Sequence, residues 1–158
     1  MKTLLMMVGK TNDQRIISLV DEYSNRLKHY NIGFDIQVIP QLKNTKNLSD
    51  LQQKQMEGIA ILNNLQTGDF VVLLDEKGRE HSSQEFAEWM IKRMNMVPKR
   101  LVFIIGGPYG FSKEVYSRKN DMISLSRMTF SHQMVRLVFV EQLYRAMTII
   151  NNEPYHHS

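Results

Sequence analysis

The chain of 158 residues contains no cysteine. A disulfide framework, a cysteine nucleophile and a zinc site built from thiolates are therefore excluded. The absence is compatible with a reducing compartment, where disulfides are rare, but does not require one. A chain of this length can bury roughly 70% of the surface that its unfolded form exposes, so it needs neither a metal nor a disulfide for stability.

Long apolar runs are also missing. No run approaches the roughly 18 residues that a membrane span needs. The N-terminal run at residues 3–8 is shorter than a signal-peptide core and is followed by Gly9-Lys10 rather than by a small-residue cleavage site. We therefore expect a soluble, cytoplasmic protein. No repeat, low-complexity tract or flexible linker divides the sequence, which predicts a single domain over residues 1–158.

The positive charge is unevenly distributed along the chain. The formal net charge is +4, yet residues 1–98 contain 12 Lys or Arg and 12 Asp or Glu. The whole excess lies in residues 99–158, which contain eight basic and four acidic side chains. Such an asymmetry is typical of a region that faces a polyanion, although a solvated basic face is an equally good explanation of charge alone.

Segments with strand and helix character alternate along the sequence. Apolar or alternating segments predict strands at residues 3–8, 34–38, 70–74, 101–105 and 122–126. Periodicity and capping residues predict helices at 13–30, from Ser49 toward Gly68, from Ser82 to Pro98, from Ser112 to about Lys119, and from about Ser131 to Ile150. We expect Leu51, Ile59 and Leu62 at the apolar positions of the second helix, and a polar loop at residues 75–81. This order predicts an α/β fold with a mostly parallel sheet of five or six strands and helices on both faces.

The last predicted helix has apolar side chains around nearly its whole circumference, from Met134 to Ile150. A helix of this kind is buried on more than one side. One side can pack on the sheet, so the other side predicts contact with a second copy of the chain. A helix that is buried within a single core is the alternative.

The glycine loop, Gly106-Gly107-Pro108-Tyr109-Gly110, follows the fourth predicted strand. Ligands of open α/β sheets bind at the carboxyl ends of the strands, and glycine lets backbone approach a ligand closely. The loop lacks both the dinucleotide fingerprint and the Gly-Lys-Ser/Thr ending of a P-loop. A dinucleotide or a nucleoside triphosphate is thus disfavoured, while another ligand or a tight turn without a ligand stays open.

The last helix also contains charged side chains at helical spacing. His132 and Arg136 lie one turn apart and could meet a phosphate or a developing anion, although a histidine that caps the helix start is the simpler interpretation. Glu141 and Arg145 have the same spacing, for which a structural ion pair is favoured. The adjacent histidines near the C-terminus lack a carboxylate-rich partner motif, so no metal site is predicted.

Four ordered blocks resemble the RlmH family of SPOUT-class methyltransferases, which modify N3 of a pseudouridine in 23S ribosomal RNA. The blocks are residues 104–110, 125–136, 141–146 and 154–156, and the similarity extends from the Val-Gly-Lys after the first strand to the tail. The resemblance implies a C-terminal trefoil knot, an exception to the general absence of knots. It also implies a homodimer formed through the last helix and the knot region.

The resemblance further implies that the cofactor is S-adenosylmethionine, with no metal, bound by backbone of the knot loops. Carried over by position, the cofactor-binding residues are Leu74, Gly106, Leu125, Ser126, Arg127, Met128, Thr129 and Phe130. This cofactor has no phosphate, which agrees with the missing phosphate fingerprints. One departure is Ser131, which stands where the family usually has proline before the histidine; serine can cap a helix as proline can start one.

The methyl sulfonium is a reactive donor, so the enzyme mainly positions the uracil N3, which must also lose its proton. We expect four catalytic residues: His132, Arg136, Tyr155 and His156. Tyr155 and His156 would reach over a site that could be the partner's. The expected contacts to RNA phosphates are Lys113, Arg118, Lys119 and Arg127. A non-catalytic ribosome-associated or assembly factor, and a SPOUT enzyme for another RNA, are the alternatives. The sequence leaves open whether the acceptor is the free large subunit or the assembled ribosome.

Overall fold

The computed structural model describes residues 1–157 and contains one five-stranded sheet in the order β2-β1-β4-β3-β5. Every neighbouring pair of strands is parallel. The strands are β1 (Lys2–Val8), β2 (Phe34–Ile39), β3 (Phe70–Glu80), β4 (Arg100–Ile105) and β5 (Asp121–Ser124). The predicted α/β fold with a parallel sheet is thereby confirmed, with five strands in the described part of the chain.

In residues 1–157, four α-helices connect successive strands and a fifth follows the last strand; serine or aspartate caps the start of each helix. The helices are α1 (Gln14–Leu27), α2 (Asp50–Asn63), α3 (Ser83–Met96), α4 (Lys113–Arg118) and α5 (His132–Ile150). Ser49 and Ser82 each form the predicted capping box, with Gln52 and Glu85. Ser131 caps α5 by accepting the N–H of Met134 at 3.1 Å. A short 3-10 helix (Thr45–Asn47) precedes α2.

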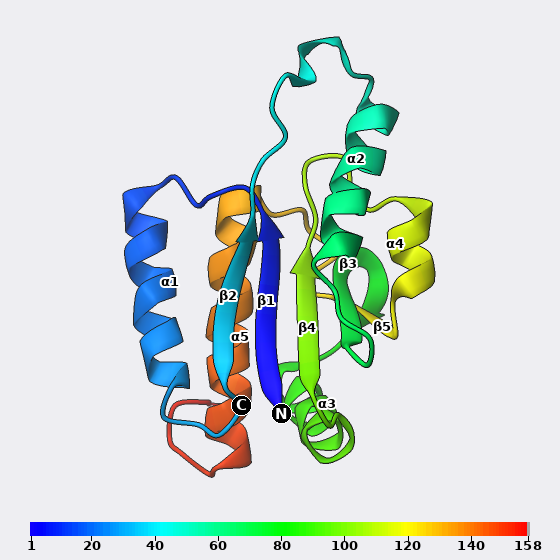
Figure 1. Ribbon diagram of the computed structural model, residues 1–158. Coiled ribbons are helices and arrows are strands. Elements are labelled where there is room, and N and C mark those ends of the chain that lie inside the picture. The colour runs from blue at the N-terminus through cyan, green and yellow to red at the C-terminus, as the bar shows by residue number, and fades with distance from the viewer. Residues whose placement is uncertain (158) are drawn as a thin grey trace.

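The helices cover both faces of the sheet (Figure 1). On one face, α1, α3 and α5 bury a core centred on Phe103 and Phe139, whose ring centroids are 4.7 Å apart. On the other face, α2 and α4 bury a second core around Ile61 and Val115. Because β4 is buried on both faces, residues 101–105 form a continuous apolar run rather than an alternating one.

The prediction of a polar loop at residues 75–81 is wrong, because β3 continues to Glu80. Leu74 and Arg79 both pair with Ile123 of β5, so the four residues between them form an irregularity in the strand that does not pair with β5. A Cβ on Gly78 would lie 2.6 Å from the backbone of Ile123, so only glycine allows this close approach. The polar composition of residues 75–80 gave no indication of a strand, because the end of β3 is formed by pairing with β5, far along the chain.

The predicted positions of α2 are also partly wrong. The helix ends at Asn63 rather than near Gly68, and the predicted core residues Leu51 and Ile59 are exposed. Glu57, Gly58 and Ile61 are buried instead. A Cβ on Gly58 would lie 2.3 Å from the hydroxyl oxygen of Ser112, so this glycine lets α2 approach the start of α4.

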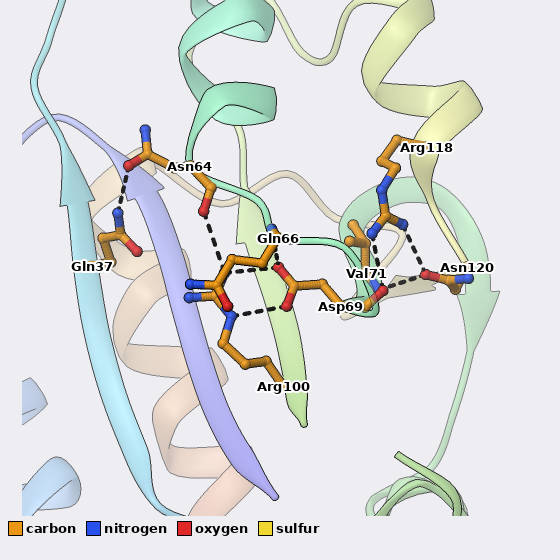
Figure 2. Close-up of polar contacts among 8 residues, drawn as sticks. All are labelled: Gln37, Asn64, Gln66, Asp69, Val71, Arg100, Arg118 and Asn120. Atoms are coloured by element: carbon orange, nitrogen blue, oxygen red, sulfur yellow. Dashed lines mark hydrogen bonds and ion pairs between the residues drawn. The ribbon is translucent and has the colours of Figure 1, made fainter. Parts of the chain in front are cut away.

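A polar network joins the loops at the amino ends of β3 and β4 (Figure 2). Asp69 accepts from Arg100 Nε at 2.9 Å and from Arg100 Nη2 at 2.7 Å, and it also accepts the N–H of Gln66. Arg118 donates to the carbonyl oxygen of Asp69 at 3.0 Å and to Asn120 at 3.2 Å. The network ties the end of α2 and the end of α4 to the sheet, opposite the glycine loop. Among residues 1–157, no helix is long and apolar enough to cross a membrane.

Candidate active site at the carboxyl ends of the strands

A pocket of about 490 Å³ opens where β3, β4 and β5 end. The glycine loop, the segment after β5 and the irregularity within β3 form its walls. Its lining residues include Lys54, Leu74, Asp75, Glu76, Lys77, Ile105, Gly106, Gly107, Tyr109, Tyr116, Leu125, Ser126, Met128, Thr129, Phe130, His132 and Val135. This is the edge at which open α/β sheets bind ligands.

The glycine loop is held by close packing and by a tight turn. The N–H of Gly110 donates to the carbonyl of Gly107 at 3.2 Å, and Gly110 has a φ of 81°. A Cβ on Gly106 would lie 3.0 Å from the ring of Phe111, and one on Gly107 would lie 2.3 Å from a carboxyl oxygen of Glu57. Packing therefore requires glycine at position 107, and Gly106 lies close against the Phe111 ring.

The segment after β5 forms part of the pocket lining. Ser124 donates its hydroxyl to the carbonyl of Ser126 at 3.0 Å, and the hydroxyl of Ser126 accepts the N–H of Met128 at 2.9 Å. Met128 is 80% exposed, so an apolar side chain lies open at the pocket mouth. These two hydrogen bonds between serine side chains and the backbone stabilise the turn, which lies outside the helices and strands.

The structure brings nearly all of the predicted cofactor-binding residues to this pocket. Leu74, Gly106, Leu125, Ser126, Met128, Thr129 and Phe130 line it, although they come from three separate parts of the chain. Arg127 is absent from the lining; its exposed side chain lies 3.4 Å from Glu80. A role in cofactor binding stays a prediction for all eight residues.

His132 and Arg136, which share a helix face, occupy different surroundings. His132 is exposed at the first position of α5 and lines the pocket. Arg136 is 3% exposed and donates to the carbonyl of Val8 and to the hydroxyl of Thr11, both at 2.9 Å. Burial lowers the pKa of its guanidinium. Arg136 thus joins α5 to the end of β1 and does not reach the pocket lining.

The C-terminal tail folds back on α1 and α5. Tyr155 donates its hydroxyl to Glu141 at 3.0 Å, and its ring lies under the guanidinium of Arg145 at 4.7 Å. His156 is 3.1 Å from Arg145, which forms the expected ion pair with Glu141 at 2.7 Å. Burial, the hydrogen bond shared with the Tyr23 hydroxyl and the proximity of Glu141 raise the pKa of Tyr155.

Within one chain, the C-terminal tail lies at the opposite end of the sheet from the carboxyl ends of the strands, where the pocket opens (Figure 1). Glu141 follows His132 by nine positions, which is about 14 Å along a helix that rises 1.5 Å per residue. The contacts of Tyr155 and His156 are with Glu141 and Arg145 and with α1, so a single chain does not bring them together with His132.

The predicted phosphate contacts are also separated. Arg118 belongs to the network at the amino ends of the strands, where two of its nitrogens already donate to Asp69 and Asn120. Lys113 begins α4, and Lys119 donates to the carbonyl of Tyr116 at 3.2 Å. Contacts to RNA stay a prediction for all four residues. Arg118 is the least available of them because its guanidinium already donates two hydrogen bonds.

The sequence patterns missed several pocket residues. Asp75, Glu76 and Lys77 reach the pocket through the irregularity in β3, and Tyr116 of α4 donates its hydroxyl to Asp75 at 2.5 Å. Burial and this hydrogen bond raise the pKa of Tyr116. Lys54 enters the lining from α2. No motif marks these positions, since only the pairing of β3 with β5 places them. Over residues 1–157 there is no group of three or more His, Asp or Glu suited to a metal ion.

Comparison with known proteins identifies the class of protein to which this fold and pocket belong. A family model described as "Predicted SPOUT methyltransferase" matches residues 1–156, so the chain belongs to the SPOUT methyltransferase family and is an enzyme of that class. A solved structure described as a probable methylase family protein from Haemophilus influenzae Rd KW20 has a TM-score of 0.51. Its 11% identity, over 99% of this chain and 70% of that one, supports the fold alone.

Curated relatives are much more similar and have nearly the same length. A protein named "Ribosomal RNA large subunit methyltransferase H" from Parabacteroides distasonis is 59% identical over 157 residues, which is 99% of both chains. Proteins of the same name from Bacteroides fragilis and Christiangramia forsetii are each 60% identical, over 99% and 97% of both chains.

Proposed function

We propose that this chain transfers the methyl group of S-adenosylmethionine to N3 of a pseudouridine in 23S ribosomal RNA of the large subunit, in the cytoplasm. The observation that carries the proposal is the convergence of the glycine loop, residues 125–130 and His132 on one pocket. Its support from relatives is the shared name of chains about 60% identical over almost their full length.

The lining residues fit this cofactor by size and by chemistry. A volume of about 490 Å³ lies within the usual range of small-molecule sites. Leu74, Ile105 and Leu125 offer apolar side chains for an adenine ring, beside the exposed backbone of Gly106. Leu74, Gly106 and residues 125–130 would hold the cofactor. When bound, S-adenosylmethionine supplies a methyl group on a cationic sulfur, which a nitrogen nucleophile can attack.

The chain itself must position the uracil ring and handle one proton. His132 is exposed at the pocket rim, where its imidazole can accept the N3 proton or donate a hydrogen bond to a carbonyl oxygen of the base. The buried guanidinium of Arg136 holds the first turn of α5 against Val8 and Thr11, which fixes the direction of that helix start.

The proposed active enzyme is a homodimer formed through α5 and the knot region. Met134 is 42% exposed, and Leu137 and Val138 are only partly buried, so one side of α5 presents apolar surface. Because Tyr155 and His156 cannot join His132 within one chain, their proposed catalytic role requires the tail of the second subunit. Such a site exists only in the dimer.

A methyl-transfer assay with labelled S-adenosylmethionine tests the proposal on assembled ribosomes, isolated large subunits and transfer RNA. We expect label at one uracil N3 of 23S ribosomal RNA, mapped by mass spectrometry of nuclease fragments. Label on transfer RNA alone would favour an enzyme for another RNA. Absence of cofactor binding by calorimetry, with ribosome binding retained, would favour a non-catalytic assembly factor.

A further inference from the structure

A buried carboxyl group with no role in the proposed chemistry lies behind the glycine loop. Glu57 of α2 is 3% exposed. Its Oε1 atom has no hydrogen-bond partner among residues 1–157, and its Oε2 atom is 3.5 Å from Nε2 of Gln53, the outer limit of a hydrogen bond. A buried polar atom without a partner destabilises a protein, so its presence requires a physical explanation.

The unpartnered oxygen lies against Gly107. A Cβ on Gly107 would lie 2.3 Å from Oε1, 2.8 Å from Cδ and 2.9 Å from Oε2 of Glu57, closer than real contacts allow. The carboxyl group therefore fills the space that any side chain at position 107 would need. Gly107 lines the pocket while Glu57 does not, so the carboxyl group supports the pocket wall from outside.

The helix that holds Glu57 is fixed by a close contact one position after it and borders the pocket one turn before it. Lys54, one turn earlier, lines the pocket. Gly58 packs so closely on Ser112 that a Cβ there would lie 2.3 Å from the serine hydroxyl. The glycine loop thus runs between two contacts with one turn of α2, at Gly107 and at Ser112. If the glycine loop moves, it therefore moves relative to the Glu57 carboxyl group, which α2 holds in place.

We propose that Glu57 is a positioning residue for the glycine loop: its carboxyl group accepts the backbone N–H of Gly107 when a ligand fills the pocket. The carboxyl group lies against Gly107, which has a backbone N–H, whereas Pro108 after it has none. The proposal assigns an acceptor role to the oxygen of Glu57 that has no partner among residues 1–157. The proposal rests on the proposed function only for the identity of the ligand, S-adenosylmethionine.

Replacing the carboxyl group by an apolar side chain of similar length separates this role from a packing role. We expect Glu57→Met to have an unchanged or higher melting temperature, because an apolar side chain replaces an unpartnered polar one. Its Kd for S-adenosylmethionine rises about tenfold, which is 1.4 kcal/mol, in calorimetry. Glu57→Gln keeps an acceptor oxygen and restores most of the affinity. Gln55→Met, at an exposed position of the same helix, is the matched control with unchanged Kd and melting temperature.

The amide signal of Gly107 in nitrogen–proton correlation spectra gives a readout that packing alone does not move. In the wild-type protein the Gly107 proton shifts downfield when S-adenosylmethionine is added, and in Glu57→Met it does not. A wild-type Kd or a wild-type Gly107 shift in Glu57→Met overturns the proposal, as does a parallel loss of melting temperature and affinity that Glu57→Gln does not recover.

A second pair of variants covers the case in which Glu57→Met does not fold. Gly107→Ala forces the loop away from the carboxyl group and weakens cofactor binding, and the added Glu57→Ala change relieves the clash without supplying an acceptor. We expect the double variant to regain melting temperature but not affinity; recovery of both overturns the proposal. If the wild-type chain binds no S-adenosylmethionine, the proposed function fails instead.

Discussion

His132 is the side chain at the pocket rim that is best placed to act on a proton of the substrate. We expect His132→Ala to lower the methylation rate by about 10²- to 10⁴-fold, the usual contribution of a general acid or base. The Kd for S-adenosylmethionine and the melting temperature should stay near wild type because the side chain is exposed. His29→Ala, at an exposed position after α1, is the control. Equal rates in the two variants would remove His132 from the mechanism.

Asp69 is the residue on which the network at the amino ends of the strands depends (Figure 2). Its side chain is 1% exposed and pairs with Arg100, whose side chain is 17% exposed. Asp69→Ala leaves the guanidinium buried without its partner, so we expect a loss of about 3–5 kcal/mol in the free energy of unfolding, measured with urea. Glu22→Ala removes an exposed pair with Arg26 and should cost at most about 0.5 kcal/mol.

Burial raises the pKa of Glu57 above its ordinary value of 4.5, while the Gln53 side chain opposes the shift. The folded protein therefore binds this proton more tightly than the unfolded chain does. The resulting stability is fully present below pH 4.5 and is lost as the pH rises through the folded-state pKa. We expect urea unfolding across a pH series from 4.5 upward to show this decline in wild type and a smaller one in Glu57→Met.

At the scale of elements, the pairing of β3 with β5 shapes one pocket wall. Gly78 allows the two strands to meet after the irregularity, since a Cβ there would lie 2.6 Å from backbone of Ile123. We expect Gly78→Ala to lower stability by about 1–3 kcal/mol, as overpacking commonly does, and to weaken S-adenosylmethionine binding. Arg79→Ala, at the next position, keeps the backbone pairing and serves as the control. Calorimetry and thermal unfolding measure both effects.

Elements with local signals could be predicted, and elements with distant partners could not. The Ser49 and Ser82 capping boxes and the apolar run at residues 101–105 specify their own structure within a few positions. The end of β3 depends on β5, more than 40 positions away, and the buried face of α2 depends on the contact of Gly58 with Ser112. Local composition contains no information on either contact.

At the scale of the whole molecule, the separation of tail and pocket predicts shared sites in the dimer. His132→Ala and Tyr155→Ala chains should each be nearly inactive as homodimers. In a mixed dimer, one site has both intact residues, so random mixing should restore about a quarter of wild-type activity. Co-expression with two different tags isolates the mixed dimer for assay. Mixed dimers without activity would place both residues at the same site of one chain, and an active Tyr155→Ala homodimer would remove the tail from catalysis.

The sequence by itself determined the α/β class, the five strands, the caps of the helices and the ordered blocks that resemble a SPOUT enzyme. These depend on periodicity, capping chemistry and residue identity, which are local properties of the chain. Only the tertiary structure decided that Leu74, Gly106 and residues 125–130 meet in one pocket, that Arg136 anchors β1, and that Glu57 lies against Gly107. The reason is physical: each of these facts is a contact between distant segments, fixed by how the helices and the sheet pack together.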